Sequence, residues 1–290
     1  MNLQIAKRKQ AKIKMAIQGP SGSGKTVGAL YVAFGLCGNW SKVVVIDTEN
    51  YSASLYSDLG SYSVLNITAP YAPEKYVEAI QQCEQAGFEV IIIDSISHEW
   101  EGTGGIIDVH GNMAGNSFTN WSKITPRHNA FVQTILQSKC HVIATLRSKQ
   151  DYVLTEKNGK QVPEKVGMKP IQRDGTDYEF TIVFDLDIKH NAVASKDRTG
   201  LFMDKPDCKL TPHVGKQIDL WCNQGLPVDH LADRIHACPT LEELYKLYRQ
   251  HPDKQKSHYQ HFADKKKQLQ MAMPILSTHY SFQKQENGNK

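Results

Sequence analysis

The chain carries the stretch Gly19-Pro20-Ser21-Gly22-Ser23-Gly24-Lys25-Thr26, which decides its fold. This stretch fits the pattern GxxxxGK[ST] in full, and it lies between an apolar run over 13–18 and a helical pattern over 25–36. Its glycines let successive backbone N–H groups curl around a phosphate without a clash from Cβ, and the helix start adds the positive end of its dipole. The stretch therefore predicts a nucleoside-triphosphate site whose phosphate-binding residues run from Gly19 to Thr26.

Three side chains predict how the phosphates and a magnesium ion would be held. We expect Lys25 to reach the β- and γ-phosphates and Thr26 to ligate Mg²⁺. Asp94 ends the apolar run over 90–93. A carboxylate at the end of a buried parallel strand points into the crevice where ligands bind. We therefore expect ATP and Mg²⁺ as cofactors, with Thr26 and Asp94 at the metal.

Apolar runs alternate with helical patterns along the first two-thirds of the chain. Helices are expected from Pro73 and over 118–137, and strands at the apolar runs 42–47, 64–67, 89–94 and 140–146. The β-branched runs 42–47 and 89–94 are typical of strands buried on both faces. This alternation predicts an α/β fold with a mostly parallel, twisted sheet.

The pattern changes after Asp151. Asn158-Gly159 favours a type I′ turn, which predicts a β-hairpin around it. The runs over 180–188 and 193–202 are typical of antiparallel strands at the edge of the sheet.

Composition and charge divide the chain into four segments. A capping box that starts at Thr240 predicts a helix in the polar C-terminal part. We expect a basic N-terminal arm over 1–12, a P-loop core over 13–205, a small helical region over 206–278 and a flexible tail over 279–290.

Composition excludes some classes of protein and leaves others open. Hydrophobic residues make up 40% of the 290 residues and charged residues 22%, which is typical of a globular chain with a buried core. No apolar run approaches the ~18 residues of a membrane span, and no apolar region follows the basic N-terminus as in a signal peptide. The six cysteines form no CxxC pair. We therefore expect a cytoplasmic protein without a membrane partner, and the net charge of +4 permits a nucleic-acid partner without requiring one.

The carboxylate that activates the attacking water has two candidates. Asp94 is followed by Ser95, whereas ATPases of the AAA+ type usually carry Asp-Glu there, and this departure argues against that type. Glu49 follows the strand expected over 42–47, and Glu99 lies shortly beyond Asp94. Both strands should end at the same crevice, so the residues by themselves favour Glu49 and leave Glu99 open.

The chain resembles the RecA recombinase core at the phosphate loop, at Ile46-Asp47-Thr48-Glu49 and at Ile93-Asp94-Ser95. In that family the glutamate after the strand that follows the P-loop helix polarises the attacking water, so the resemblance implies Glu49 as the base. It also covers Cys140-His-Val-Ile-Ala-Thr-Leu-Arg147, which looks like the strand whose last polar residue senses the γ-phosphate. Arg147 departs from the glutamine that RecA-like proteins often carry at that point.

A second element also resembles this superfamily. Lys196 and Arg198, in Ser195-Lys-Asp-Arg-Thr-Gly200, resemble the Lys-x-Arg element of RecA-related ring and filament ATPases, including DnaB-type helicases. There the two basic residues act as an arginine finger on the nucleotide of the neighbouring subunit. The resemblance implies catalytic roles for Lys196 and Arg198, active sites shared between subunits and a homo-oligomer, either a ring or a filament. A basic turn in an ordinary hairpin is the structural alternative.

Within this superfamily the span 12–203 looks like the phage and prophage RecA-core ATPases linked to single-strand annealing and recombination. The likeness rests on Ser97-His-Glu-Trp100, Ile124–Asn129, Ala144–Lys149 and Gln172–Glu179. It implies a location in the cytoplasm of a bacterial host or of a phage-infected cell.

Two stretches leave the sheet where RecA-like proteins carry DNA-binding loops, namely 101–120 and 148–175. A basic, glycine-flexible strip with an aromatic side chain suits a single-stranded backbone and a stacked base. The candidate DNA contacts are Lys149, Tyr152, Lys157, Lys160, Lys165, Lys169 and Arg173. Acidic residues of the same region dilute the field, so a solvated hairpin of mixed charge is the alternative.

Two functional hypotheses follow. The leading one is an oligomeric, Mg²⁺-dependent ATPase that binds single-stranded DNA and acts in phage-type recombination, annealing or replication. The alternative is a nucleotide-switched assembly or helicase-loader module with slow turnover.

Overall fold

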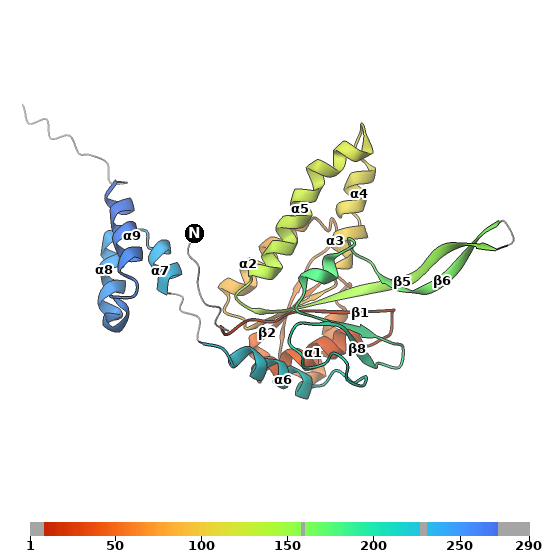
Figure 1. The fold of residues 1–290 in the computed structure, drawn as a ribbon, viewed down its shortest axis with the longest axis horizontal. Helices are drawn as coiled ribbons and strands as arrows, with labels where there is room; N and C mark the ends of the chain where they lie inside the picture. Colours follow the sequence, from red (N-terminus) through yellow and green to blue (C-terminus); the bar gives the residue numbers. More distant parts are fainter. Residues whose placement is uncertain (1–8, 158–159, 227–230, 272–290) are drawn as a thin grey trace, which may run out of the picture. The chain divides into compact units, whose positions relative to one another are not determined.

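Strands from distant parts of the chain form one sheet, with the strand of the phosphate loop inside it (Figure 1). This computed structural model describes residues 9–157, 160–226 and 231–271. The strands are β1 (Lys14–Gly19), β2 (Val43–Asp47), β3 (Ser63–Asn66), β4 (Val90–Asp94), β5 (His141–Lys157), β6 (Lys160–Pro170), β7 (Ile182–Leu186) and β8 (Ala192–Asp197). Their order is β3-β2-β4-β5-β1-β7-β8, and β6 pairs with β5 outside this path.

The pairing confirms the predicted α/β class. Neighbours from β3 through to β7 are parallel, whereas β8 runs antiparallel to β7 and β6 antiparallel to β5. The expectation of an antiparallel edge strand over 180–188 was therefore wrong, because β7 pairs with β1 in parallel and, of the two, only β8 lies at the edge. The hairpin expected around Asn158-Gly159 is formed by β5 and β6, although these two turn residues lie outside the described residues. β5 continues past the sheet as one arm of that hairpin, which projects from the sheet in Figure 1.

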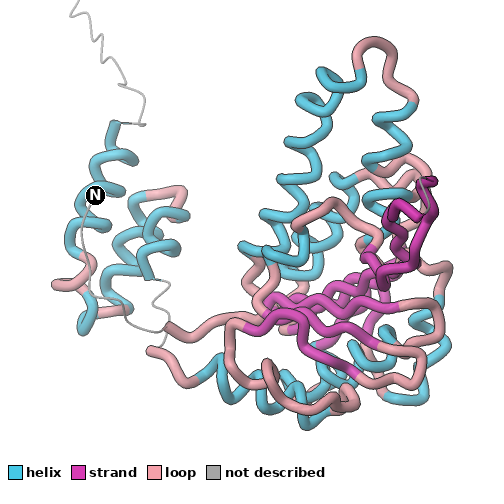
Figure 2. Tube along the Cα trace, turned by 45° about the vertical axis from the view of Figure 1, so that its right-hand side comes forward, coloured by secondary structure: helices cyan, strands magenta, loops and turns pink. Residues whose placement is uncertain are grey.

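Helices cover both faces of the sheet (Figures 1 and 2). Those of the first compact unit are α1 (Lys25–Cys37), α2 (Pro73–Gln85), α3 (Ser97–Glu101), α4 (Ile106–Gly111), α5 (Ser117–Gln137) and α6 (Pro212–Asn223). Successive side chains of a strand point to opposite faces. Val90 and Ile92 of β4 therefore pack with α1 and α6, and Ile91 and Ile93 pack with α2 and α5. Burial on both faces explains the unbroken β-branched runs.

The core unit ends later than the boundary expected at residue 205. It spans Met1–Leu226, because α6 packs directly on α1. A Cβ added to Gly35 would lie 2.0 Å from the carbonyl oxygen of Pro212, and one added to Gly215 would lie 2.1 Å from that of Val32. The two helix backbones thus approach each other where both residues are glycine.

Gly215→Ala is expected to destabilise this unit by about 2–3 kcal/mol, because the added methyl group forces α1 and α6 apart. All four tryptophans of the chain precede residue 227, so urea unfolding followed by tryptophan fluorescence reports on this unit. Gly111→Ala is the matched control, since a Cβ there meets nothing within 4 Å. Equal midpoints for the two variants would contradict the close packing of α1 on α6.

The start of the described chain is attached to the end of the same unit. The Gln10 amide donates to the Leu226 carbonyl at 2.8 Å, and the Ala11 amide donates to that of Cys222 at 3.2 Å. Residues 1–8 of the expected basic arm lie outside the described residues.

The second unit, Pro227–Lys290, holds α7 (Leu231–Ala237), α8 (Leu241–Gln250) and α9 (Tyr259–Met271). Its small core includes Leu231, Ile235, Leu244, Leu247 and Phe262. Thr240 caps α8 as expected, since its hydroxyl accepts from the Glu243 amide at 3.2 Å. The tail expected over 279–290 lies outside the described residues. In the described part of the chain, no helix combines the length and apolar character that crossing a membrane requires.

Four short 3₁₀ segments complete the described elements. They are η1 (Trp40–Lys42), η2 (Ser52–Leu59), η3 (Thr176–Glu179) and η4 (Pro252–Lys254).

Candidate active site

The phosphate loop has the conformation that its glycines predict. Gly22 and Gly24 take φ angles of 77° and 84°, a region that favours glycine. The Lys25 ammonium folds back over the loop and donates to the carbonyls of Gly19 (2.9 Å) and Pro20 (2.8 Å). α1 begins at Lys25, so the first free N–H groups of the helix face the same loop. These groups together form a cradle for phosphate.

Asp94 and Thr26 meet beside this cradle. The Thr26 hydroxyl donates to Asp94 Oδ2 at 2.6 Å, and the Thr145 hydroxyl donates to Oδ1. Burial raises the pKa of Asp94, which is only 2% exposed, while these two hydrogen bonds oppose the rise. A hydroxyl and a carboxylate are hard oxygen donors of the kind that hold Mg²⁺ together with substrate phosphates. The residues present therefore fit the magnesium ion that the sequence predicts.

Glu49 lies next to this pair. The register of β2 and β4 sets Asp47 opposite Asp94, which brings the residues after both strands together. The Ser95 hydroxyl donates to Glu49 Oε1 at 2.9 Å, and Arg147 binds the carboxylate with two N–H groups, Nε to Oε1 at 2.8 Å. Burial acts to raise the pKa of Glu49, but the hydrogen bonds from Arg147 and Ser95 outweigh it and hold the pKa below its usual value. Glu49 is therefore ionised at neutral pH.

The charges of Asp94 and Glu49 also act on the ammonium of Lys25. Burial lowers the pKa of its ammonium, and the charges of Asp94 and Glu49 oppose that effect. The structure thus brings Lys25, Thr26, Glu49, Asp94 and Arg147 into one cluster at the carboxyl ends of the parallel strands.

Glu99 lies outside this cluster. Its carboxylate is fully buried and lies 3.1 Å from Nδ1 of His128. It accepts a hydrogen bond from the side-chain Nε2 of Gln172 at 3.3 Å. Among the described residues it makes no hydrogen bond to the five cluster residues. The structure therefore separates the two carboxylates that the sequence left open.

Asp47, which the RecA resemblance included without a role, supports the site. Its buried carboxylate accepts from the Glu49 amide at 2.6 Å and from the Ala53 amide at 2.9 Å. These bonds fix the chain just after β2 and so orient Glu49. The only sequence signal was an acidic residue at the end of an apolar run, the same signal that marked Asp94.

Lys196 and Arg198 lie near the start of β1, at the opposite end of that strand from the phosphate loop. The Arg198 amide donates to the Thr181 carbonyl, and the Thr181 amide donates to the carbonyl of Lys14, the first residue of β1. The phosphate loop follows the last residue of β1, about 17 Å away at roughly 3.3 Å per residue. Both basic side chains donate to the Tyr178 carbonyl, Arg198 at 3.1 Å. The structure does not bring them to the nucleotide site of their own chain.

A pocket of about 320 Å³ adjoins the phosphate loop on one side. Val27 and Tyr31 of α1, Leu210 and His190 line it together with Gly24. A largely apolar pocket one helical turn from the phosphate cradle suits the base of a nucleotide. Its lining comes from three separate segments of the chain, so apart from the loop glycine no sequence motif marks it.

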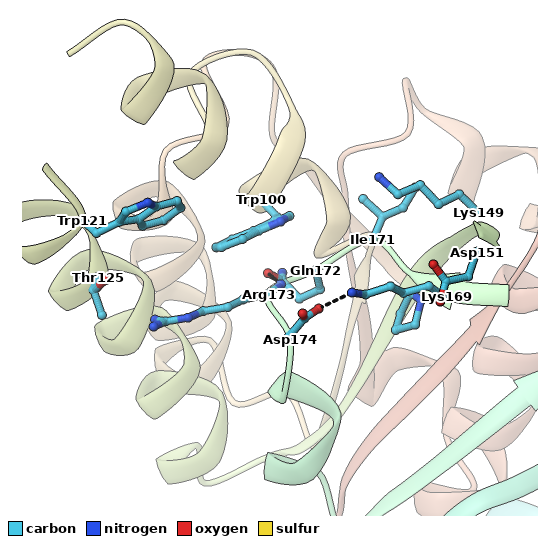
Figure 3. A pocket seen from close by; sticks show the side chains of 11 residues that line it. Trp100, Trp121, Thr125, Lys149, Asp151, Lys169, Ile171, Gln172, Arg173 and Asp174 are labelled. Atoms are coloured by element: carbon cyan, nitrogen blue, oxygen red, sulfur yellow. Dashed lines mark hydrogen bonds and ion pairs between the residues drawn. The ribbon is translucent and has the colours of Figure 1, made fainter. Parts of the chain in front are cut away.

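The candidate DNA residues that the structure describes lie around a second pocket, of about 580 Å³ (Figure 3). Lys149, Lys169 and Arg173 line it together with Trp100 and Trp121, which the sequence analysis did not single out as contacts. The backbones of four further candidates lie in β5 and β6, but their side chains are outside the described ones: Tyr152, Lys157, Lys160 and Lys165.

Comparison with known families finds one described as an AAA domain, whose model matches residues 11–209. The match covers more than half of the chain and includes the whole cluster from Lys25 to Arg147. No curated protein matches the chain. Because the family match includes Asp94 and Ser95, the absence of a glutamate after Asp94, which argued against an AAA-type ATPase, does not exclude the chain from this family.

Proposed function

The chain belongs to the AAA domain family of P-loop nucleoside triphosphatases, and from this premise we propose that it is a Mg²⁺-dependent ATPase acting on single-stranded DNA. We place it in phage-type recombination or annealing, or in replication. The observation that carries the proposal is the contact of Thr26 with Asp94 at 2.6 Å beside the ionised Glu49.

Each member of the cluster has a distinct task. Lys25 and the loop amides bind the β- and γ-phosphates, and Thr26 and Asp94 would hold the metal. Mg²⁺, when bound, neutralises the charge that develops on the phosphate oxygens. Glu49 orients the attacking water and accepts its proton, since its carboxylate is ionised and lies at the crevice.

Arg147 connects Glu49 to the γ-phosphate. Its guanidinium binds Glu49, and its backbone lies opposite Gly19 at the last position where β5 pairs with β1, before β5 continues into the hairpin. A guanidinium there can exchange the carboxylate for phosphate oxygens, because Arg binds both anions with the same pair of N–H groups. This exchange would free Glu49 for water when ATP is present.

The sites are shared between subunits in this proposal. Arg198 is exposed and about one strand length from its own phosphate loop, so a role at a nucleotide would have to be at the nucleotide of another copy. A cation at the γ-phosphate stabilises the charge of the transition state. Assembly into a ring or a filament then becomes a condition for hydrolysis.

Lys25→Ala tests the nucleotide site. Loss of a charged hydrogen-bond donor is expected to weaken ATP binding about 10- to 100-fold, as measured by calorimetry with Mg²⁺ present. Lys42→Ala is the control, because Lys42 donates to the Gly87 carbonyl at 3.2 Å and belongs to no phosphate site. Hydrolysis by the unaltered protein should require Mg²⁺ and increase when single-stranded DNA is added. Unchanged ATP affinity in Lys25→Ala would overturn the site.

A further inference from the structure

The groove shown in Figure 3 is built from four separate segments. Trp100 comes from α3, Trp121 from α5, Lys149 and Lys169 from the base of the β5–β6 hairpin, and Arg173 from the chain after β6. The pocket of about 580 Å³ lies between them. The feature that the proposed function leaves unexplained is the pair of tryptophans.

The two indoles lie nearly parallel on one side of the groove. Their ring centroids are 6.0 Å apart at an interplanar angle of 23°. His110 stacks on Trp121 at 4.2 Å, and His128 contacts Trp100 edge-on at 5.3 Å. Both indoles are only partly buried. These neighbours hold the two indoles in fixed positions at the lining of the pocket, where the exposed part of their aromatic surface can take a further flat ring.

The segment below the indoles is held firmly as well. Gln172 is buried, and its side-chain Nε2 donates to the Ile96 carbonyl at 3.0 Å and to the Glu99 carboxylate at 3.3 Å. Its side-chain oxygen accepts from the Arg173 amide at 2.8 Å. Arg173 is therefore presented to the groove by a fixed backbone.

The charges around the groove nearly balance. Lys169 pairs with Asp174 at 2.7 Å, and Lys149 lies 3.8 Å from Glu101. Asp151 also lines the pocket. Within the described residues Arg173 makes no ion pair, and its guanidinium donates only to the Asn129 side-chain oxygen at 3.4 Å. Because positive and negative charges nearly cancel here, the groove attracts a phosphate backbone only weakly. Its aromatic surface is therefore the main source of affinity for a ligand.

We propose that the groove binds an unpaired nucleobase of single-stranded DNA by stacking on Trp100 and Trp121, with Arg173 on a flanking phosphate. This rests on the proposed action on DNA. Duplex DNA does not fit the role, because its bases are already stacked and paired, whereas an unpaired base has a free π face. The affinity of this groove for single-stranded DNA should therefore depend more on the presence of bases than on the salt concentration.

Fluorescence anisotropy of a labelled oligothymidine measures this with the full-length protein and a slowly hydrolysed ATP analogue. Trp100→Leu and Trp121→Leu are each expected to lower the affinity roughly 5- to 100-fold, the range for one stacked base. Trp121→Phe should retain most of the affinity, because it keeps an aromatic face. Phe118→Leu is the matched control, since Phe118 lies on the same helix, is 86% exposed and does not line the groove.

Two further arms separate stacking from charge. An abasic oligonucleotide of equal length keeps every phosphate but loses stacking on both tryptophans, so the unaltered protein should bind it at least as weakly as Trp121→Leu binds oligothymidine. The salt dependence of binding should be the same in Trp121→Leu as in the unaltered protein. In Arg173→Gln its slope should fall by about 0.7, the value for one phosphate contact on a single strand.

The outcomes distinguish this proposal from the one it rests on. Equal affinity for abasic and normal oligonucleotides, with full affinity in both leucine variants, would overturn base stacking and leave DNA binding standing. Absence of binding to any oligonucleotide would overturn DNA binding itself. Circular dichroism melting of each variant shows whether a loss of affinity reflects a loss of fold.

Discussion

Glu49→Gln is expected to reduce kcat for ATP hydrolysis by about 10²- to 10⁴-fold, the range for loss of a positioned general base. Glutamine keeps the size of the side chain and can still accept from the Ser95 hydroxyl, but it cannot take a proton from water. ATP affinity should change little, because the phosphate cradle and the Thr26–Asp94 contact are untouched. Phosphate release and ATP binding, measured on the same preparation, separate the two effects.

Two controls accompany this measurement. Glu78→Gln removes an exposed carboxylate of α2 and should leave turnover unchanged. Glu99→Gln tests the alternative base. It removes the partner of His128 and is expected to lower stability rather than to abolish turnover at a temperature where the protein is folded. Full turnover in Glu49→Gln together with loss in Glu99→Gln would reverse the assignment.

Arg198→Ala is the second change with a large expected effect, about 10³-fold or more in kcat with ATP affinity retained. The reason is that the guanidinium would stabilise charge on the γ-phosphate of a neighbouring subunit only in the transition state. Its contact with the Tyr178 carbonyl is a surface contact, so its removal should not unfold the chain. Arg249→Ala, an exposed arginine of α8, is the matched control.

Mixing gives the sharpest form of this test. Arg198→Ala and Glu49→Gln are each expected to hydrolyse ATP very slowly alone, but a mixed assembly would contain interfaces in which an intact Glu49 meets an intact Arg198. Recovery of turnover on mixing is the expected result. A monomeric nucleotide switch, the helicase-loader alternative, would show no recovery and would retain its slow turnover in Arg198→Ala at every protein concentration.

The fold was predictable where the signals are local. The glycine positions of the phosphate loop and the β-branched runs of β2 and β4 each act within a few residues. The observed β2 and β4 accordingly begin and end within a residue of the expected runs, whereas the strand expected over 140–146 continues to Lys157 and the one expected over 193–202 ends at Asp197. The boundary near residue 205 was harder to place, because α6 has the polar character of the helices beyond it. Its assignment to the core depends on tertiary contacts, above all its packing on α1, glycine against glycine.

Some residues of the candidate site could likewise be identified from the sequence, and others only from the structure. Lys25, Thr26 and Asp94 could be found from their positions in a motif and at a strand end. The residues favoured Glu49 but left Glu99 open, since both follow strands that end at one crevice. The side chains decide it: Ser95 and Arg147 bind Glu49, whereas His128 and Gln172 enclose Glu99. Trp100 and Trp121 went unrecognised as a pair because their elements meet only in the folded chain.

The amino-acid sequence by itself determined the phosphate loop, the parallel sheet and the class of ligand, since backbone conformation and burial pattern depend on neighbours along the chain. The tertiary structure alone decided which carboxylate joins the nucleotide site, where the core ends and which aromatic rings share a groove. Those outcomes depend on strand register and helix packing, which bring together residues that no sequence interval relates.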